Sequence, residues 1–264
     1  MKPLLIEIAE HLFRVRPAAE WVREWLAGSF AVRYEAEADG LEPHMTVDIE
    51  DGCGVPFAGY DVDVREEEGA TTYRRADYFI RIDSSFRNAH IGVYDAFALK
   101  HAMMNLYSAY IVHHSWGLLV HSSCVVERGR AYLFSGYSGA GKSTVAKLSM
   151  PRQLLSDEAT IVKLCGPGGA IAFDSPFRSE LETHEGNRSY PLHGVYFLRQ
   201  SQQVLNKPLS KGEGFLCLTD KVFYWSRNPQ ETAKIFRLCR RLIDSTPTYD
   251  LYFQKNDSFW EMIS

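Results

Sequence analysis

The residues of this chain that are best suited to chemistry form a glycine-rich loop ending in a lysine and a serine. The pattern is Gly-x4-Gly-Lys-Ser over residues 136–143, with a further glycine at 139. In such a loop the backbone N–H groups turn toward a bound anion, the lysine reaches the β- and γ-phosphates, and the serine hydroxyl holds Mg²⁺. The loop therefore predicts a nucleoside triphosphate site, with ATP and Mg²⁺ as the expected ligands.

The context of the loop supports this interpretation. Residues 131–135 are an apolar stretch typical of a buried strand, and Val145, Ala146 and Leu148 give the following segment the apolar face of a helix. The competing interpretation is a glycine-rich structural turn. The residues expected to contact the nucleotide are Gly136, Ser138, Gly139, Ala140, Gly141, Lys142, Ser143 and Thr144.

An acidic pair, Asp157 and Glu158, follows the loop after enough residues for one helix and one short return strand. This spacing would place both carboxylates at the carboxyl end of the strand beside the loop, where phosphates bind. One carboxylate would then hold Mg²⁺ and the other would accept a proton from an acceptor hydroxyl. An ordinary acidic turn is the alternative.

A histidine, His121, lies in a strand-like segment before the loop. It is either a functional group of the same site or a core histidine bonded to a carbonyl. Cys124 lies three residues further on, and its neighbours Val125 and Val126 favour a packing role over a catalytic one.

The elements that must position these residues are indicated by the apolar pattern. Strands are expected at 118–126, 131–135, 154–155, 194–198 and 249–253, helices at 94–113 and 229–242, a hairpin turn at 165–169, and a short closing segment at 259–263. Upstream, residues 5–28 predict an amphipathic helix or helix pair interrupted at Pro17, and strands are expected at 45–49, 60–64 and 78–82. The fold class is α/β, with an α+β region at 1–104 and the P-loop core at 105–264.

Composition excludes several classes of function. A net charge of −4 and a pI near 6.1 leave no basic surface for nonspecific nucleic-acid binding. Glu7 and Glu10 interrupt the apolar stretch that a signal peptide needs, and no run of about 18 apolar residues is present, so we expect a cytoplasmic protein without a membrane span. Five cysteines without a CxxC pair predict neither a zinc site nor a disulfide framework. The run Arg237, Arg240 and Arg241 predicts one solvated helix face.

Three segments together resemble the core of the HPr kinase/phosphorylase superfamily, which is related to ATP-dependent phosphoenolpyruvate carboxykinase. They are His121-Ser-Ser, Phe134-Ser-Gly-Tyr-Ser-Gly-Ala-Gly-Lys-Ser-Thr and Leu155-Ser-Asp-Glu. The resemblance implies a mixed sheet around the P-loop and ATP-dependent phosphoryl transfer to a serine. It also implies that Asp157 is the base, that Glu158 stands in place of a second aspartate and holds Mg²⁺ with Ser143, and that His121 orients the acceptor or the γ-phosphate.

The chain departs from HPr kinases because no Glu-x-Arg-Gly-x-Gly segment follows the acidic pair. Instead, residues 174–180, 190–198 and 249–253 with Trp260 are similar to HPr-kinase-like proteins of ribosomal-peptide gene clusters, including lasso-peptide precursor kinases. That similarity implies transfer to a serine at the C-terminus of a peptide. It makes Arg178 the candidate charge partner of the transferred phosphate, beside an acceptor loop at 183–188. A surface arginine is the alternative.

Other acceptors and roles stay open at this point. They are an HPr-type protein, free serine or another metabolite, and a nucleotide-responsive binding protein that recognises a precursor peptide without transferring phosphate. The sequence is compatible with either a monomer or a homo-oligomer.

Overall fold

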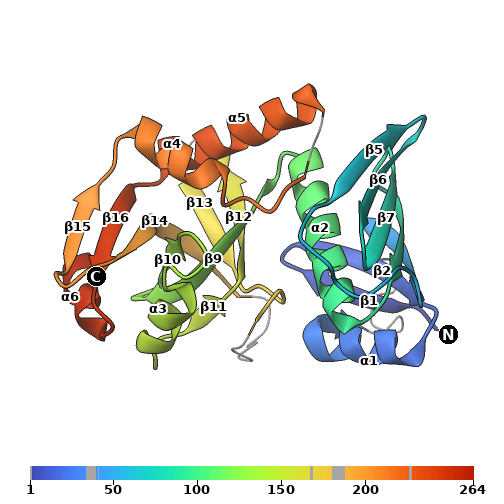
Figure 1. Cartoon of the computed structure of the whole chain (residues 1–264), viewed down its shortest axis with the longest axis horizontal. Helices are drawn as coiled ribbons and strands as arrows, with labels where there is room; N and C mark the ends of the chain where they lie inside the picture. The colour runs from blue at the N-terminus through green and yellow to red at the C-terminus, as the bar shows by residue number, and fades with distance from the viewer. Residues whose placement is uncertain (1, 34–39, 41, 167–168, 180–187, 226–227) are drawn as a thin grey trace. The chain divides into compact units, whose positions relative to one another are not determined.

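The computed structural model describes residues 2–33, 40, 42–166, 169–179, 188–225 and 228–264, and the chain divides into two compact units (Figure 1). Unit 1 comprises Met1–His113 and Trp225–Asn228, and unit 2 comprises His114–Tyr224 and Pro229–Ser264. Each unit contains its own sheet and helices, so the chain is mixed α/β. The boundary expected at 104/105 falls inside helix α2 (Ala96–His113).

Unit 1 is built on a mixed sheet with the strand order β3-β1-β2-β4-β8-β7-β6-β5. Its central strand β4 pairs in parallel with β2 and with β8, whereas the flanking pairs are antiparallel. Helix α1 (Glu20–Ser29) packs against β2, and the largely buried α2 packs on β7 and β8. The strands are β1 (Leu4–Ile8), β2 (His11–Pro17), β3 (Ala31–Arg33), β4 (Met45–Asp51), β5 (Asp63–Glu67), β6 (Ala70–Arg75), β7 (Tyr78–Asp83) and β8 (Asn88–Val93).

The helix predicted over residues 5–28 is wrong in its first half, where the chain forms the antiparallel hairpin β1–β2. Nearly every residue of β1 is buried, and a short apolar run fits a buried strand as well as it fits a helix. Pro17 ends β2 rather than interrupting a helix. The strand expected at 60–64 begins only at Asp63, because Tyr60 lies outside it and packs edge-on against Phe57.

Unit 2 contains five strands that close on themselves. The pairing runs β10-β9-β12-β13-β14, and β14 returns to pair in parallel with β10. Strands β16 and β15 extend the sheet beyond β14, and β11 pairs with β9. The strands are β9 (Gly117–Glu127), β10 (Arg130–Ser135), β11 (Leu154–Ser156), β12 (Ala159–Cys165), β13 (Gly169–Phe173), β14 (Ser189–Gln200), β15 (Leu205–Pro208) and β16 (Thr248–Phe253).

Helices of unit 2 are α3 (Lys142–Leu148), α4 (Lys211–Thr219), α5 (Pro229–Ser245), the 3₁₀ turn η3 (Asp257–Phe259) and α6 (Trp260–Ile263). An aromatic core lies between the β10–β14–β16 strands and the C-terminal turns, formed by Tyr132, Phe134, Tyr196, Phe253, Phe259 and Trp260. Helix α4 was missed in the sequence although Ser210 and Glu213 form a complete capping box at its start.

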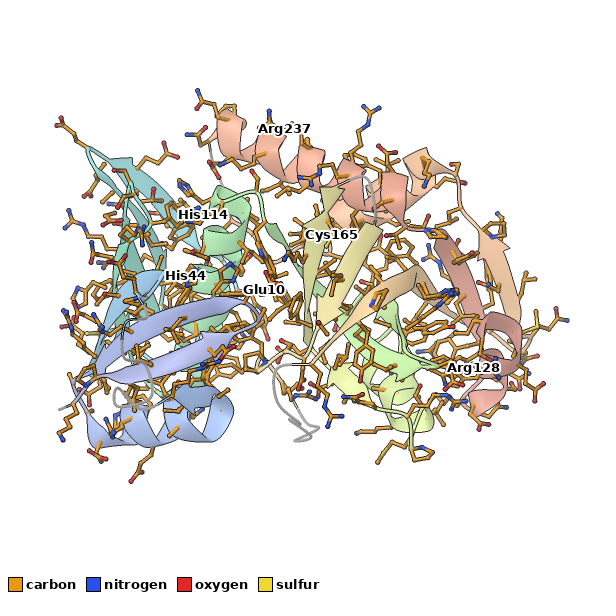
Figure 2. All side chains as sticks on the ribbon, turned by 180° about the vertical axis from the view of Figure 1, so that it is seen from behind. Glu10, His44, His114, Arg128, Cys165 and Arg237 are labelled. Carbon is orange, nitrogen blue, oxygen red and sulfur yellow. The ribbon has the colours of Figure 1, made fainter. Side chains whose placement is uncertain are left out.

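Helix α5 presents its basic residues to solvent, as predicted. Arg237, Arg240 and Arg241 are exposed, and Figure 2 marks Arg237 among the side chains of this helix. The opposite face of α5 is apolar and buried through Leu238, Leu242 and their neighbours. Across the described ranges, none of the helices combines the length and apolar character that crossing a bilayer requires.

Candidate functional site

The glycine-rich loop connects the buried end of β10 to the first residue of α3. Gly141 caps the helix with φ +108, and a Cβ at this position would lie 2.6 Å from the Phe253 ring. A Cβ on Gly136 would lie 2.7 Å from the Cβ of Ala140. Both positions therefore require glycine, one for backbone conformation and close approach and the other for close approach alone.

Lys142 begins α3 and folds back over the loop. Its ammonium donates hydrogen bonds to the carbonyl oxygens of Gly136 at 3.1 Å and Tyr137 at 3.2 Å. The residue is 9% exposed, and no carboxylate in the described part of the chain pairs with its charge. Burial, followed by the nearby charge of Lys221, lowers the pKa of Lys142. A buried cation without a counter-ion would be stabilised by a bound anion.

The register of β9 brings the remaining candidate residues to this loop. Ser122 pairs with Ser135 at the end of β10, and His121 pairs with Ala159 at the start of β12. One strand thus carries neighbours of both the glycine loop and the acidic pair. Ser123 adds a direct link, since its hydroxyl donates to the carbonyl oxygen of Lys142 at 3.1 Å.

Three buried hydroxyl groups hold β9, β11 and β12 together next to the loop and the acidic pair. The Ser122 hydroxyl donates to Thr160 Oγ1 at 2.6 Å, and Ser156 Oγ lies 2.5 Å from the same atom. All three residues are fully buried. Such a saturated polar cluster holds β9, β11 and β12 in one arrangement, because a shift would leave buried hydroxyls unpaired.

Asp157 and Glu158 occupy the irregular step between β11 and β12. Asp157 is 3% exposed, and its Oδ1 accepts a hydrogen bond of 3.0 Å from the backbone N–H of Ser179. The carbonyl oxygen of Glu158 accepts from the N–H of Ser122, while its side chain is half-buried. The backbone at 158 is thereby fixed to β9, and both acidic residues line the pocket beside the loop.

His121 lies on β9 with its backbone bonded on both sides. Its N–H donates to the carbonyl oxygen of Lys221 at 2.6 Å, and its carbonyl oxygen accepts from the Ser135 hydroxyl at 2.7 Å. Burial, Lys142 and Lys221, in that order, lower the pKa of the imidazole to about 4. The ring is therefore neutral near pH 7 and can exchange hydrogen bonds without adding positive charge.

The glycine loop, the acidic pair and His121 line one pocket of about 440 Å³, which lies wholly within unit 2. Nine of the residues expected from the sequence are part of its wall: His121, Ser138, Gly139, Gly141, Lys142, Ser143, Thr144, Asp157 and Glu158. Gly136 and Ala140 are not in the wall. Gly136 supports it through its carbonyl contact with Lys142, and Ala140 packs against the aromatic core.

Arg178 is not part of the pocket wall either. Its guanidinium contacts Asp174 at 2.5 Å and the carbonyl oxygens of Leu154 at 3.3 Å and Leu155 at 3.2 Å. The Arg178 and Asp174 side chains are 10% and 1% exposed. Arg178 therefore ties the 174–178 segment to β11. The acceptor loop expected at 183–188 lies outside the described residues except for Arg188.

Sequence reasoning missed three residues of the pocket wall, Ser179, Gln200 and Lys255. Gln200 ends β14 and donates to the carbonyl oxygen of Gly139 at 2.8 Å. A signal was available for it, because strands parallel to the loop's strand end at the same edge of the sheet. Ser179 lies in the 174–180 segment that the resemblance picked out, although not as a site residue, and no sequence pattern indicates Lys255.

Metal binding at this pocket would depend on few protein ligands. Within the described ranges, no group of three or more His, Cys, Asp or Glu side chains is arranged to hold a metal ion. Mg²⁺ suits such a site, because it takes one or two protein oxygens and completes its shell with phosphates and water. The pocket wall carries several side-chain oxygens, among them those of Ser143 and Glu158, the two residues expected from the sequence to hold Mg²⁺.

Cys124 does not belong to this chemistry. It is fully buried on β9, and burial raises the pKa of its thiol far above the usual range. A protonated, inaccessible thiol is not a nucleophile.

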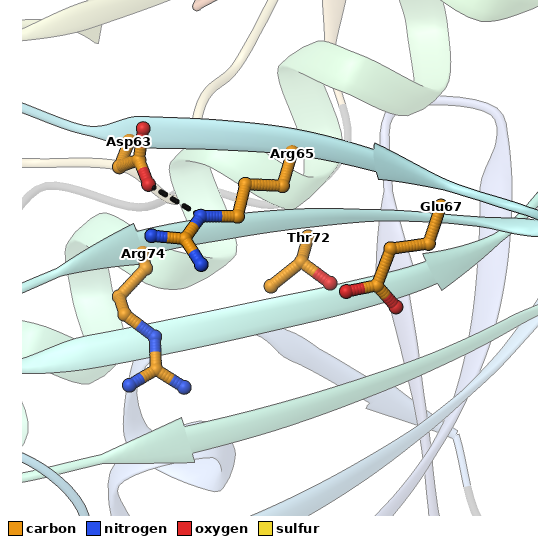
Figure 3. A pocket seen from close by; sticks show the side chains of 5 residues that line it. All are labelled: Asp63, Arg65, Glu67, Thr72 and Arg74. Carbon is orange, nitrogen blue, oxygen red and sulfur yellow. Dashed lines mark hydrogen bonds and ion pairs between the residues drawn. The ribbon is translucent and has the colours of Figure 1, made fainter.

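A second hollow, of about 250 Å³, lies in unit 1 on strands β5 and β6 (Figure 3). Its wall carries both signs of charge, from Asp63 and Glu67 and from Arg65 and Arg74, together with the uncharged Thr72. Arg65 pairs with Asp63 at 2.8 Å, and the Arg65 side chain is 74% exposed. This is a solvated strand surface without a glycine loop or a buried cation, so it does not compete with the unit 2 pocket as a triphosphate site.

The chain belongs to the family described as SynChlorMet cassette protein ScmC, whose model matches residues 93–264. The match covers all of unit 2 and therefore every residue of the pocket wall. No curated protein matches the sequence.

Proposed function

We propose that this member of the ScmC family is an ATP- and Mg²⁺-dependent kinase that transfers the γ-phosphate to a serine hydroxyl of a peptide. The carrying observation is that Lys142, Asp157, Glu158 and His121 line the same pocket as the glycine loop. These side chains come from three separate stretches of the chain. A structural glycine turn would give no reason for a buried lysine, a buried aspartate and a histidine to meet around it.

The pocket fits a triphosphate in size and in charge. Its volume of about 440 Å³ is within the range of small-molecule sites. The loop supplies backbone N–H groups at the start of α3, and Lys142 supplies a buried positive charge. Ser143 and Glu158 would hold Mg²⁺, which would offset the negative charge of the phosphates during transfer. We further propose the HPr-kinase-like arrangement of sheet and P-loop for unit 2.

Asp157 would serve as the base for transfer. The acceptor serine gives its hydroxyl proton to the Asp157 carboxylate, and the serine oxygen forms a bond to the γ-phosphorus. The bond between that phosphorus and the β,γ-bridging oxygen breaks, and ADP leaves with the electron pair. The hydrogen bond from the Ser179 N–H orients the Asp157 carboxylate, and a positioned carboxylate can accept a proton as a base. Neutral His121 can orient the acceptor hydroxyl or the phosphate.

The acceptor is the part of the proposal that goes beyond the pocket. The family is described as a cassette protein, so peptides encoded beside this chain that end in serine are the first acceptors to test. The 174–178 segment, which resembles the peptide-cluster kinases in sequence, lies next to Asp157 through the Ser179 hydrogen bond. An acceptor approaching Asp157 would therefore meet this segment.

The proposal is tested by mass spectrometry of a panel of acceptors incubated with the protein, ATP and Mg²⁺. The panel contains a serine-ending peptide encoded beside this chain (the cassette peptide), the same peptide with its terminal serine changed to alanine, free serine and HPr. We expect phosphate on the serine-ending peptide alone. Phosphate on HPr or on free serine alone would replace the peptide by that acceptor, and ATP binding without any transfer would favour the precursor-binding protein.

A further inference from the structure

A second lysine, Lys221, is buried next to the pocket and has no role in the chemistry described so far. It is 6% exposed and follows helix α4 directly. Lys221 is far from Lys142 in the sequence, but both side chains contact Tyr137. The Tyr137 carbonyl oxygen accepts a hydrogen bond from Lys142 at 3.2 Å, and the Tyr137 ring lies 3.7 Å from the Lys221 ammonium.

The backbone holds Lys221 in this place. The carbonyl oxygen of Lys221 accepts from the N–H of His121 at 2.6 Å, and the N–H of Phe223 donates to the carbonyl oxygen of Leu119 at 2.9 Å. Val222 forms an isolated bridge with Val120 between these two bonds. Residues 221–223 therefore run along β9 at the position of the site histidine, and this pairing fixes the backbone of Lys221 beside His121.

The charge of Lys221 acts on a residue of the pocket wall. After burial and Lys142, it contributes to the lowered pKa of His121. Its carboxylate partner, Asp220 at 2.6 Å, is 51% exposed in its side chain, so solvent weakens that pairing. The Lys221 side chain itself is only 7% exposed, so solvent screens its positive charge less than it screens the charge of Asp220.

An arrangement of two buried ammonium groups around one loop residue is unfavourable on its own. Like charges placed close together in a partly desolvated site destabilise each other. The arrangement becomes favourable once a multiply charged anion lies beside it. Arg178, the residue that sequence comparison suggested for this charge, is already bound to Asp174 and to backbone carbonyls.

We propose that Lys221 is the second positive charge of this phosphate pocket and that it stabilises the terminal phosphate of the bound nucleotide. This inference rests on the proposed function, because it presumes that the pocket binds ATP. Lys221 would act together with Lys142, which would contact the phosphates directly. The Lys221 ammonium lies over the Tyr137 ring, and this cation–π contact favours a position of the ammonium beside the loop.

The test compares nucleotide affinities of three variants by isothermal titration with ATP and with ADP, each with Mg²⁺. Lys221→Met keeps the length of the side chain and removes its charge, Lys221→Arg keeps the charge, and Lys207→Met removes one charge from exposed strand β15. We expect Lys221→Met to weaken ATP binding by about tenfold or more and ADP binding by less than about threefold. Lys221→Arg should retain most of the ATP affinity, and Lys207→Met should match the wild type.

A second measurement does not depend on nucleotide. The pKa of His121, followed by NMR and assigned with His121→Gln, should rise in Lys221→Met and stay low in Lys221→Arg. A packing role for Lys221 would not produce that difference between the two variants. Circular dichroism shows whether each variant is folded.

The outcomes separate the two proposals. A wild-type protein that binds neither nucleotide would overturn the kinase proposal and this inference with it. If the wild type binds ATP but Lys221→Met lowers ATP and ADP affinities equally, or lowers neither, only the role of Lys221 is overturned. An unchanged His121 pKa in folded Lys221→Met would contradict the placement of its charge beside the pocket.

Discussion

The Asp157 carboxylate accepts a hydrogen bond of 3.0 Å from the backbone N–H of Ser179. This contact orients a carboxylate that is almost fully buried at the edge of the pocket. It also joins the end of β11 to the segment that follows β13. A single change at Asp157 can therefore separate the chemistry of the carboxylate from its place in the fold.

Asp157→Asn should retain ATP binding and lose phosphoryl transfer by about 10²-fold or more, because an amide cannot accept the serine proton. The amide oxygen can still accept from Ser179, so the fold should be preserved. Single-turnover kinetics measures the transfer, and titration calorimetry measures the binding. Near-normal transfer by this variant would move the base to His121.

Gly141→Ala should abolish most ATP binding and destabilise unit 2. The added Cβ would lie 2.6 Å from the Phe253 ring, and the backbone has φ +108. The matched variant is Gly139→Ala, whose φ is +77 but whose Cβ would meet nothing within 4 Å. It should show backbone strain alone, about 1–2 kcal/mol. Thermal denaturation and ATP titration of both variants check this, and equal effects would contradict the steric argument.

Arg178→Met should destabilise the protein by about 3 kcal/mol, because it removes the Arg178 charge from an ion pair whose Asp174 carboxylate is buried. ATP affinity of the folded variant should stay close to that of the wild type. Arg128→Met is the matched control, since that side chain is 75% exposed and its loss should change stability by less than about 0.5 kcal/mol. Urea denaturation reports the stabilities. A stable variant with strongly weakened ATP binding would return Arg178 to the phosphate site.

The protonation of His121 makes a prediction about pH. Its pKa is about 4 in the folded chain against an ordinary value of 6.5, so between these values the unfolded chain binds a proton that the folded chain does not. The contribution of His121 to the free energy of unfolding is therefore fully present above pH 6.5, and it is lost as the pH falls toward 4. His121→Gln should show a shallower loss over this range. His101 also titrates near 4 but is present in both proteins, so it cancels in the comparison. Parallel slopes for the two proteins would contradict the lowered pKa.

Much of the pocket could be predicted from the sequence because its key part is local. The loop from Gly136 to Thr144 is contiguous, and its glycines follow from backbone conformation. The acidic pair was also within reach, since one helix and one short strand fill the interval after Lys142. By contrast, Ser179 and Lys221 reach the site through hydrogen bonds across the fold, which no local pattern encodes. Gln200 can be placed there only once β14 is known to run parallel to β10.

The N-terminal hairpin shows a different limit of sequence reasoning. Apolar residues of β1 are nearly continuous because the strand is buried on both faces, and such a run has no period of two. The true helix α1 directly follows β2 and carries Val22 and Leu26 at helical spacing. The helical spacing of these residues does not continue before Pro17, where the chain forms the β1–β2 hairpin instead. Burial on two faces, which only the eight-stranded sheet reveals, decides between the two structures.

The most direct test of the kinase proposal follows the γ-phosphate itself. ATP with heavy oxygen on its γ-phosphorus is incubated with the protein, Mg²⁺ and the serine-ending cassette peptide, and the peptide is analysed by mass spectrometry. The proposal predicts a phosphoserine that carries three heavy oxygens and one light oxygen from the serine, with this product missing when Lys142→Ala replaces the wild type. Unmodified peptide in the presence of bound ATP, or heavy phosphate released only to water, would contradict it.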